Sequence, residues 1–132
     1  MAYEISNYAV KVTRVAGADL SALQYTFVKQ NSAGAVVAVA AATDIPIGVL
    51  QNAPTSGQEA EVLVTGGTKL KAGATITLGT HFILGTTSAG AATPLAAGTD
   101  TTKYILGAPL ATAASGDIMS AIINCAAPGR AA

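Results

Sequence analysis

The sequence predicts an all-β fold: a compact barrel or sandwich of short strands, with pseudo-repeated halves and an N-terminal arm. Three observations predict it. Apolar and β-branched residues alternate with a period of two, and no long stretch has the 3.6-residue period of an amphipathic helix. In addition, short glycine motifs recur in the same order in the two halves of the chain.

Four strands are expected in the N-terminal half, over residues 8–15, 23–29, 35–40 and 47–51. Turns containing glycine, asparagine or aspartate separate them. The alanine-rich residues 38–42 also allow a helical turn, because alanine is the best helix former. Valines at positions 36, 37 and 39 favour the strand instead, because β-branched side chains pack well in sheets.

The glycine pair at 66–67 is expected to turn the chain back between strands at 59–65 and 68–71. A two-residue and a three-residue loop are both open. The longer loop sets the carboxylate of Glu61 opposite the ammonium of Lys71, and opposite charges facing one another across a hairpin favour that register.

The remaining strands are expected over residues 75–78, 81–84, 104–106 and 117–124. The resulting organisation has an N-terminal arm and first strand at residues 1–20 and a single β domain at residues 21–125. Residues 126–132, which contain a proline and a glycine, are expected to form a loose C-terminal tail.

The internal repeat rests on three matched spacings. Ser-Ala-Gly-Ala surrounds both Gly34 and Gly90, which lie 56 residues apart. Gly48 and Gly107 lie 59 residues apart, and nine residues after each comes a second Ser-Gly pair, ending at positions 57 and 116. The repeat therefore covers about residues 32–64 and 88–123. Coincidence in a sequence rich in alanine and glycine is the alternative, and two copies are too few for a solenoid.

Composition indicates a protein that assembles with others. The 132 residues fit one domain, tryptophan is absent, and there are only two phenylalanines and four tyrosines. Only 11% of residues are charged while 51% are hydrophobic, so apolar surface should remain exposed and mark contacts with partners.

Charge and hydropathy exclude two classes of partner. Seven basic and seven acidic residues balance one another, and no basic patch suited to phosphate contacts is present, so nucleic acid is not expected to bind. The longest uncharged stretch, residues 72–99 apart from His81, is broken by glycines and a proline and is no membrane span. The first residues lack the pattern of a secretory signal, which favours synthesis in the cytosol.

Candidate catalytic residues are few. His81 is the only histidine and opens an apolar segment, and Cys125, the only cysteine, follows one. A Cys125–His81 pair has no flanking signature of a thiol enzyme, and structural roles are favoured for both residues. One cysteine also rules out an intrachain disulfide and a multi-cysteine zinc site.

The acidic residues also favour structural roles. Glu59 and Glu61 share one face of a strand, and a solvated face near Lys69 and Lys71 is favoured over a paired acid site. Asp44 and Asp100 hold matching repeat positions after threonine, which predicts side-chain hydrogen bonds to backbone amides in turns. No phosphate loop or calcium loop is present, so no enzyme activity, cofactor or metal is expected.

A family resemblance covers about residues 45–124. It is carried by glycine and small-residue spacing in the stretches Ile47-Gly48-Val49-Leu50-Gln51, Ser56-Gly57-Gln58-Glu59-Ala60-Glu61-Val62-Leu63-Val64, Lys71-Ala72-Gly73, Leu106-Gly107-Ala108 and Ala114-Ser115-Gly116, with further glycines at 67 and 79. These stretches resemble the small phage capsid decoration, or cement, proteins. The resemblance implies a β-rich protein that binds the outside of expanded heads as a homotrimer or a dimer and braces the shell against packaged DNA. It also implies the major capsid protein as partner, location on the virion surface after synthesis in the host cytoplasm, and no catalytic residues.

The N-terminal residues lie outside the matched stretches. We expect residues 1–6 to form an arm that orders on the capsid, and the candidate capsid-contact residues are Tyr3, Glu4, Tyr8 and Arg14. In the alternative interpretation Tyr8 and Val10 only complete the sheet. The rival functional classes are another virion or cell-surface β module, such as a head fibre base, a tail component or an adhesin, and an enzyme or ligand-binding barrel.

Overall fold

A computed structural model describes residues 9–41, 43–85 and 89–130, which contain ten β-strands and no helix. The all-β prediction is confirmed. The strands are β1 Val10–Val15, β2 Phe27–Gln30, β3 Val36–Ala38, β4 Gly48–Leu50, β5 Glu59–Lys71, β6 Ile83–Gly85, β7 Ala92–Pro94, β8 Tyr104–Pro109, β9 Ile118–Asn124 and β10 Gly129–Arg130. Over the same residues no helix could span a membrane.

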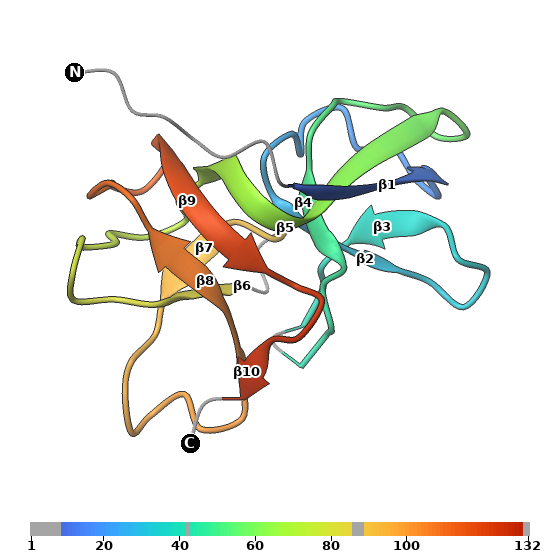
Figure 1. Cartoon of the computed structure of the whole chain (residues 1–132). Helices are drawn as coiled ribbons and strands as arrows, with labels where there is room; N and C mark the ends of the chain where they lie inside the picture. Colours follow the sequence, from blue (N-terminus) through green and yellow to red (C-terminus); the bar gives the residue numbers. More distant parts are fainter. Residues whose placement is uncertain (1–8, 42, 86–88, 131–132) are drawn as a thin grey trace.

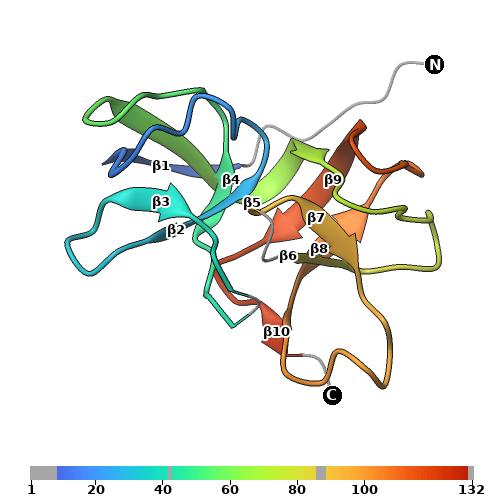
Figure 2. The same ribbon diagram turned by 180° about the vertical axis from the view of Figure 1, so that it is seen from behind.

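All ten strands belong to one sheet, in the order β3-β2-β4-β5-β9-β8-β6-β7, with β1 paired to β5 and β10 paired to β8. Every pairing between strands is antiparallel. The sheet curls into two lobes, and the long strand β5 runs from one lobe into the other (Figures 1 and 2). One lobe holds β1–β4 and the other holds β6–β9.

The two halves predicted from glycine spacing have the same strand pairing. From β5 outward the order is β5-β4-β2-β3, and from β9 outward it is β9-β8-β6-β7. Val49 pairs with Leu63, and their counterparts 59 positions later, Ala108 and Ile122, also pair. The pairing of β1 with the first part of β5 likewise matches that of the last part of β5 with β9. The repeats are therefore longer than the sequence motifs and span residues 10–65 and 66–124.

The spacing of one glycine pair now has a physical reason. A Cβ atom on Gly48 would overlap the carbonyl oxygen of Leu63, and one on Gly107 would overlap the carbonyl oxygen of Ile122. Leu63 and Ile122 are themselves counterparts. Only glycine allows this close approach of the neighbouring strand.

The predicted hairpin at the glycine pair 66–67 is wrong. β5 continues through both glycines without a turn, and Glu61 pairs with Thr13 of β1 instead of Lys71. β5 is the last strand of the N-terminal repeat and the first strand of the C-terminal repeat. Its second part finds its hydrogen-bonding partners in β9, so no turn is needed to satisfy these backbone groups.

Several strand limits also differ from the prediction. The segment before β2 is a turn in which Tyr25 adopts a φ of 65°, so it cannot alternate as a strand. In the expected strand 75–78 only Ile76 forms an isolated bridge. β7 was not expected. The expected loose tail includes β10, whose two residues pair with Tyr104 and Ile105 of β8.

Each repeat has its own core. In the N-terminal repeat a cluster of buried side chains fills the inside of the curled sheet: Ala16, Leu20, Val28, Val36, Leu50, Ala60 and Val62. A larger cluster fills the C-terminal repeat and reaches into the junction between the repeats. Its members from the C-terminal repeat include Leu70, Ile76, Ile83 and Met119.

The junction buries the second face of the N-terminal strands. Phe27, Val49 and Leu63 point away from their own repeat's core and belong to the same buried cluster as Leu106 and Ile123 of the C-terminal repeat. Burying each such side chain contributes about 1.5–3 kcal/mol. The two repeats are thus joined by an apolar interface as well as by the shared strand.

Candidate functional site

Neither candidate nucleophile nor base is arranged for catalysis. The Nδ1 atom of His81 accepts a hydrogen bond from the backbone amide of Thr77 at 2.9 Å, which ties the ring to its own turn. Cys125 is buried, and burial raises the pKa of its thiol to about 12. A thiol with this pKa stays protonated at neutral pH and is a poor nucleophile.

The two matched aspartates have the predicted turn role. Asp44 Oδ2 accepts hydrogen bonds from the backbone amides of Ala40 and Ala41, each at 2.8 Å, and from Lys29 Nζ at 2.8 Å. The Lys29 bond and these amides lower the pKa of Asp44 to about 2. Asp100 repeats the arrangement, accepting from the amide of Ala96 at 2.7 Å.

The other acidic residues of the described structure form neither a paired acid site nor a metal site. Glu61 forms an exposed ion pair with Lys11 at 3.2 Å, so its basic neighbour is on β1 and is neither Lys69 nor Lys71, the neighbours expected from the sequence. Within the described ranges, no group of three or more histidine, cysteine, aspartate or glutamate side chains could hold a metal ion.

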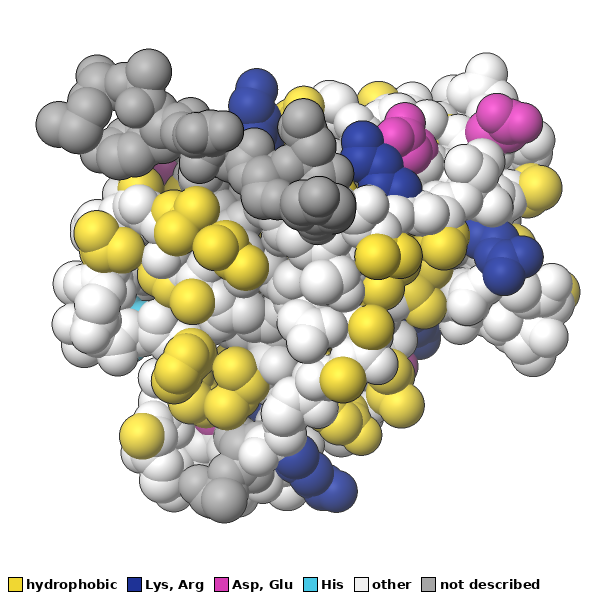
Figure 3. Space-filling view, in the orientation of Figure 1, with side chains coloured by type: hydrophobic (Ala, Val, Ile, Leu, Met, Phe, Trp, Pro, Cys, Tyr) yellow, Lys and Arg dark blue, Asp and Glu magenta, His cyan; other side chains and the backbone are white. Residues whose placement is uncertain are grey.

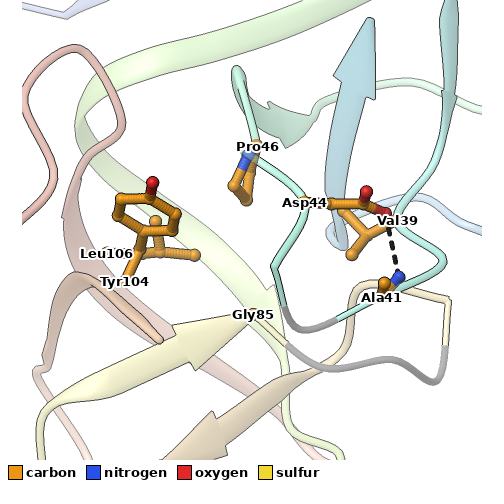
Figure 4. A pocket seen from close by; sticks show the side chains of 7 residues that line it. All are labelled: Val39, Ala41, Asp44, Pro46, Gly85, Tyr104 and Leu106. Carbon is orange, nitrogen blue, oxygen red and sulfur yellow. Dashed lines mark hydrogen bonds between the residues drawn. The ribbon is translucent and has the colours of Figure 1, made fainter. Parts of the chain in front are cut away.

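A small crevice lies at the junction of the repeats, between residues of the N-terminal repeat and Gly85, Tyr104 and Leu106 of the C-terminal repeat (Figure 4). Its volume of about 10 Å³ matches a single water molecule. Ligand sites are typically 300–1,000 Å³ in volume, on the order of thirty times larger or more. This crevice is therefore too small to be a ligand site, and the larger grooves of the described residues are open to solvent.

Of the predicted contact residues, only Arg14 falls within the described ranges; Tyr3, Glu4 and Tyr8 lie outside them. Arg14 is exposed on β1 and lines an open groove of about 360 Å³ on the N-terminal repeat. The other residues that line this groove, called here the N-terminal groove, are Thr13, Val15, Ala33, Gly34, Ala35 and Glu59.

The C-terminal repeat has a more apolar outer surface. Phe82, Ile118 and Ile122 each expose more than half of their surface. Leu110, the residue that directly follows β8, is also exposed. A shallow groove of about 340 Å³ lies here and is lined by Phe82, Ile105 and Ile122 among others. Figure 3 shows apolar side chains gathered over β8 and β9. Contiguous exposed apolar surface is typical of sites that contact other molecules.

The sequence motifs did not point to this apolar surface, although one signal was present. Phe27 and Phe82 are the only phenylalanines of the chain, and they lie 55 residues apart, one short of the repeat offset. In the structure Phe27 is fully buried at the junction, and Phe82 is exposed at the corresponding place on the other repeat.

Comparison with known proteins gives a relative by fold. No family model matches the chain, and no curated protein matches it. A solved structure does: the chain is similar to the head fiber gp8.5 N base of bacteriophage phi29, with a TM-score of 0.65 and 20% sequence identity. The match covers 89% of this chain and 95% of that one, so the two share essentially their whole fold.

Proposed function

We propose that the chain is a structural protein of a bacteriophage virion that binds the outer surface of the expanded head. One observation carries the proposal: the whole fold, nearly end to end, is that of a protein described as a head fibre base. The glycine spacings also resemble those of capsid decoration proteins, and two of these glycines, Gly48 and Gly107, are positions at which neighbouring strands approach closely.

The surface of the molecule supports a binding role. Exposed apolar side chains gather on the C-terminal repeat, and the charged pair Lys11–Glu61 lies on the N-terminal repeat. Interfaces are depleted of charge at their centres and polar at their rims. The described residues thus offer surface for protein contacts. Their only histidine accepts a hydrogen bond from a backbone amide, and their only cysteine is buried.

The major capsid protein is the proposed partner, and the protein acts on the head as a homotrimer. The N-terminal residues, with Tyr3, Glu4 and Tyr8, supply the capsid contact together with Arg14. Arg14 is exposed on β1, where its backbone pairs with Ala60 of β5.

Two roles on the head are distinguished by what binding does to the shell. A cement protein stabilises the shell against the pressure of packaged DNA. A fibre base anchors a projecting part and has no need to stabilise the shell. The similar structure is described as such a base.

The experiment mixes purified protein with expanded heads that lack surface proteins and follows the temperature at which the heads release their DNA. Binding that raises this temperature by several degrees supports the cement role. Binding that leaves it unchanged assigns the protein to the fibre-base role. Failure to bind such heads contradicts both.

A further inference from the structure

The junction between the repeats is a docking interface with two distinct sides. The N-terminal repeat contributes a projecting apolar side with Phe27 and Leu63. The C-terminal repeat contributes a receiving side, where the carbonyl of Gly90 accepts a hydrogen bond from the amide of Phe27 at 2.9 Å and the amide of Lys71 donates to the carbonyl of Tyr25 at 2.8 Å. Because the two sides differ, the repeats pack head to tail.

Head-to-tail packing leaves one unused copy of each side on the chain. The unused projecting side is on the C-terminal repeat, where Phe82 and Ile122 are the counterparts of Phe27 and Leu63. Phe82 is 55% and Ile122 52% exposed, whereas Phe27 is 0% and Leu63 2% exposed. The apolar groove described above lies at these residues.

The unused receiving side is on the N-terminal repeat. Gly34 is the counterpart of Gly90, and both have a left-handed backbone, with φ of 81° and 78°. A Cβ atom on Gly90 would overlap the backbone of Phe27, whereas one on Gly34 would meet nothing within 4 Å. The N-terminal groove opens at this point.

Residues of the N-terminal groove correspond to residues that hold the other repeat. Val15, 55% exposed, is the counterpart of Lys71, which bonds to Tyr25. The N-terminal groove is thus the empty form of the site that the turn before β2 fills at the junction.

We propose that these two unused sides bind each other between copies of the chain: the side with Phe82, Ile105 and Ile122 of one copy enters the N-terminal groove, with Val15 and Gly34, of the next. The contact repeats the packing already present at the junction, with Phe82 against Gly34 as Phe27 lies against Gly90. The occupant is a second copy because the chain itself contains both complementary surfaces.

This contact is heterologous, so each copy uses both of its sides. A heterologous contact builds a ring when its rotation closes. In the proposed homotrimer such a ring contains six repeats, three junctions within chains and three contacts between chains. The inference names the surfaces behind the self-association in the proposed function and does not depend on the head. One wall of the apolar groove is formed by the C-terminal segment at Ala127 and Gly129. This segment follows the second repeat and has no counterpart in the first.

The test uses variants of the full chain, with molar mass measured by light scattering on a size-exclusion column. Phe82→Glu places a charge on one side and Val15→Glu, in the N-terminal groove, on the other. Each variant is expected to run as a monomer where the unaltered chain forms an oligomer. Ile122→Asp and Ala35→Glu are the second variants for the two sides, should either first variant fail to fold by circular dichroism.

A matched control comes from the same strand as Ile122. Ile118 is equally exposed, at 51%, but its counterpart is Glu59, an exposed residue outside the junction. Ile118→Glu is expected to keep the mass of the unaltered oligomer. A monomer in this control would mean that any added charge on the C-terminal repeat disrupts assembly, and would overturn the assignment.

Mixing the two monomeric variants gives the sharpest result. Phe82→Glu retains an intact N-terminal groove and Val15→Glu retains an intact apolar side, so an equimolar mixture is expected to form a dimer of one chain each. A mixture that stays monomeric, a Val15→Glu variant that still assembles, or a monomeric unaltered chain overturns the inference. The assay contains no capsid, so each of these results leaves head binding to be judged separately.

Discussion

The backbone amide of Phe27 donates a hydrogen bond to the carbonyl oxygen of Gly90 at 2.9 Å, which joins the two repeats across their interface. Gly90 has a φ of 78°, and the backbone of Phe27 occupies the space that a side chain at position 90 would need. At the counterpart Gly34 the φ is similar, but the space is open. Gly34 is therefore required only by its backbone conformation, whereas Gly90 is required by its backbone conformation and by the close packing of Phe27.

Alanine substitution separates these constraints. Gly34→Ala adds only the cost of a left-handed backbone, about 1–2 kcal/mol. Gly90→Ala adds that cost and also overpacks the junction, for a total of about 2–5 kcal/mol. Unfolding in urea measures both changes. Equal losses for the two variants would contradict the close packing at the junction.

Acid should weaken the turn that contains Asp44. Its folded pKa of about 2 is below the value of about 3.9 expected in the unfolded chain, so ionised Asp44 stabilises the fold above about pH 4. That stabilisation is lost as the pH falls through about 2. Asp44→Asn should cost about 1–3 kcal/mol at pH 7 and much less at pH 2.

Melting curves of the unaltered protein and of Asp44→Asn, recorded between pH 7 and pH 2, measure this loss. Glu61→Gln, which removes an exposed ion pair with Lys11 on β1, is the control and should change the melting temperature little throughout. A difference between Asp44→Asn and the unaltered protein that stays constant down to pH 2 would argue against a charged hydrogen bond.

Cys125 should react with thiol reagents only after unfolding. Burial raises its pKa to about 12, so both access and the thiolate fraction are low in the folded protein. A disulfide reagent at pH 8 should label the unfolded chain within minutes and the folded chain at least about a hundredfold more slowly. Rapid labelling of the folded protein would show that the junction core opens readily.

Removal of residues 1–6 tests the proposed N-terminal capsid contact. The two cores and the strand pairs of the described structure begin at Ala9 and Val10, so the shortened chain should fold with an unchanged melting temperature. Its binding to expanded heads should be lost. Binding at unaltered affinity would remove Tyr3 and Glu4 from the contact. Arg14→Ala, which keeps the N-terminus, then tests the β1 surface alone.

Sequence patterns predicted the elements whose signals are local. The strand β1, the strand β9 with its alternating burial, the repeat of glycine spacings and the aspartates in matching turns all appear in the structure, although β1 is exposed along nearly its whole length. Each depends on residues close together in the chain. Gly48 and Gly107 could be recognised as equivalent because the same residue types follow them at the same distance.

The features that sequence did not predict depend on distant contacts. The glycine pair 66–67 has strong turn propensity, but β1 and β9 supply pairing along the whole of β5 and keep it extended. β1 and its counterpart in β5 share no sequence motif, so the start of the repeat was missed. The different fates of Phe27 and Phe82 follow from position, because only the first has a neighbouring repeat to cover it.

Head binding tests the central proposal most directly. Increasing amounts of the full chain are incubated with expanded heads that lack surface proteins, the heads are sedimented, and the bound copies per head are counted. We predict saturable binding, with a plateau at a fixed number of copies per head. Protein that stays in the supernatant at every concentration, or that binds without reaching a plateau, would contradict a specific place on the virion surface.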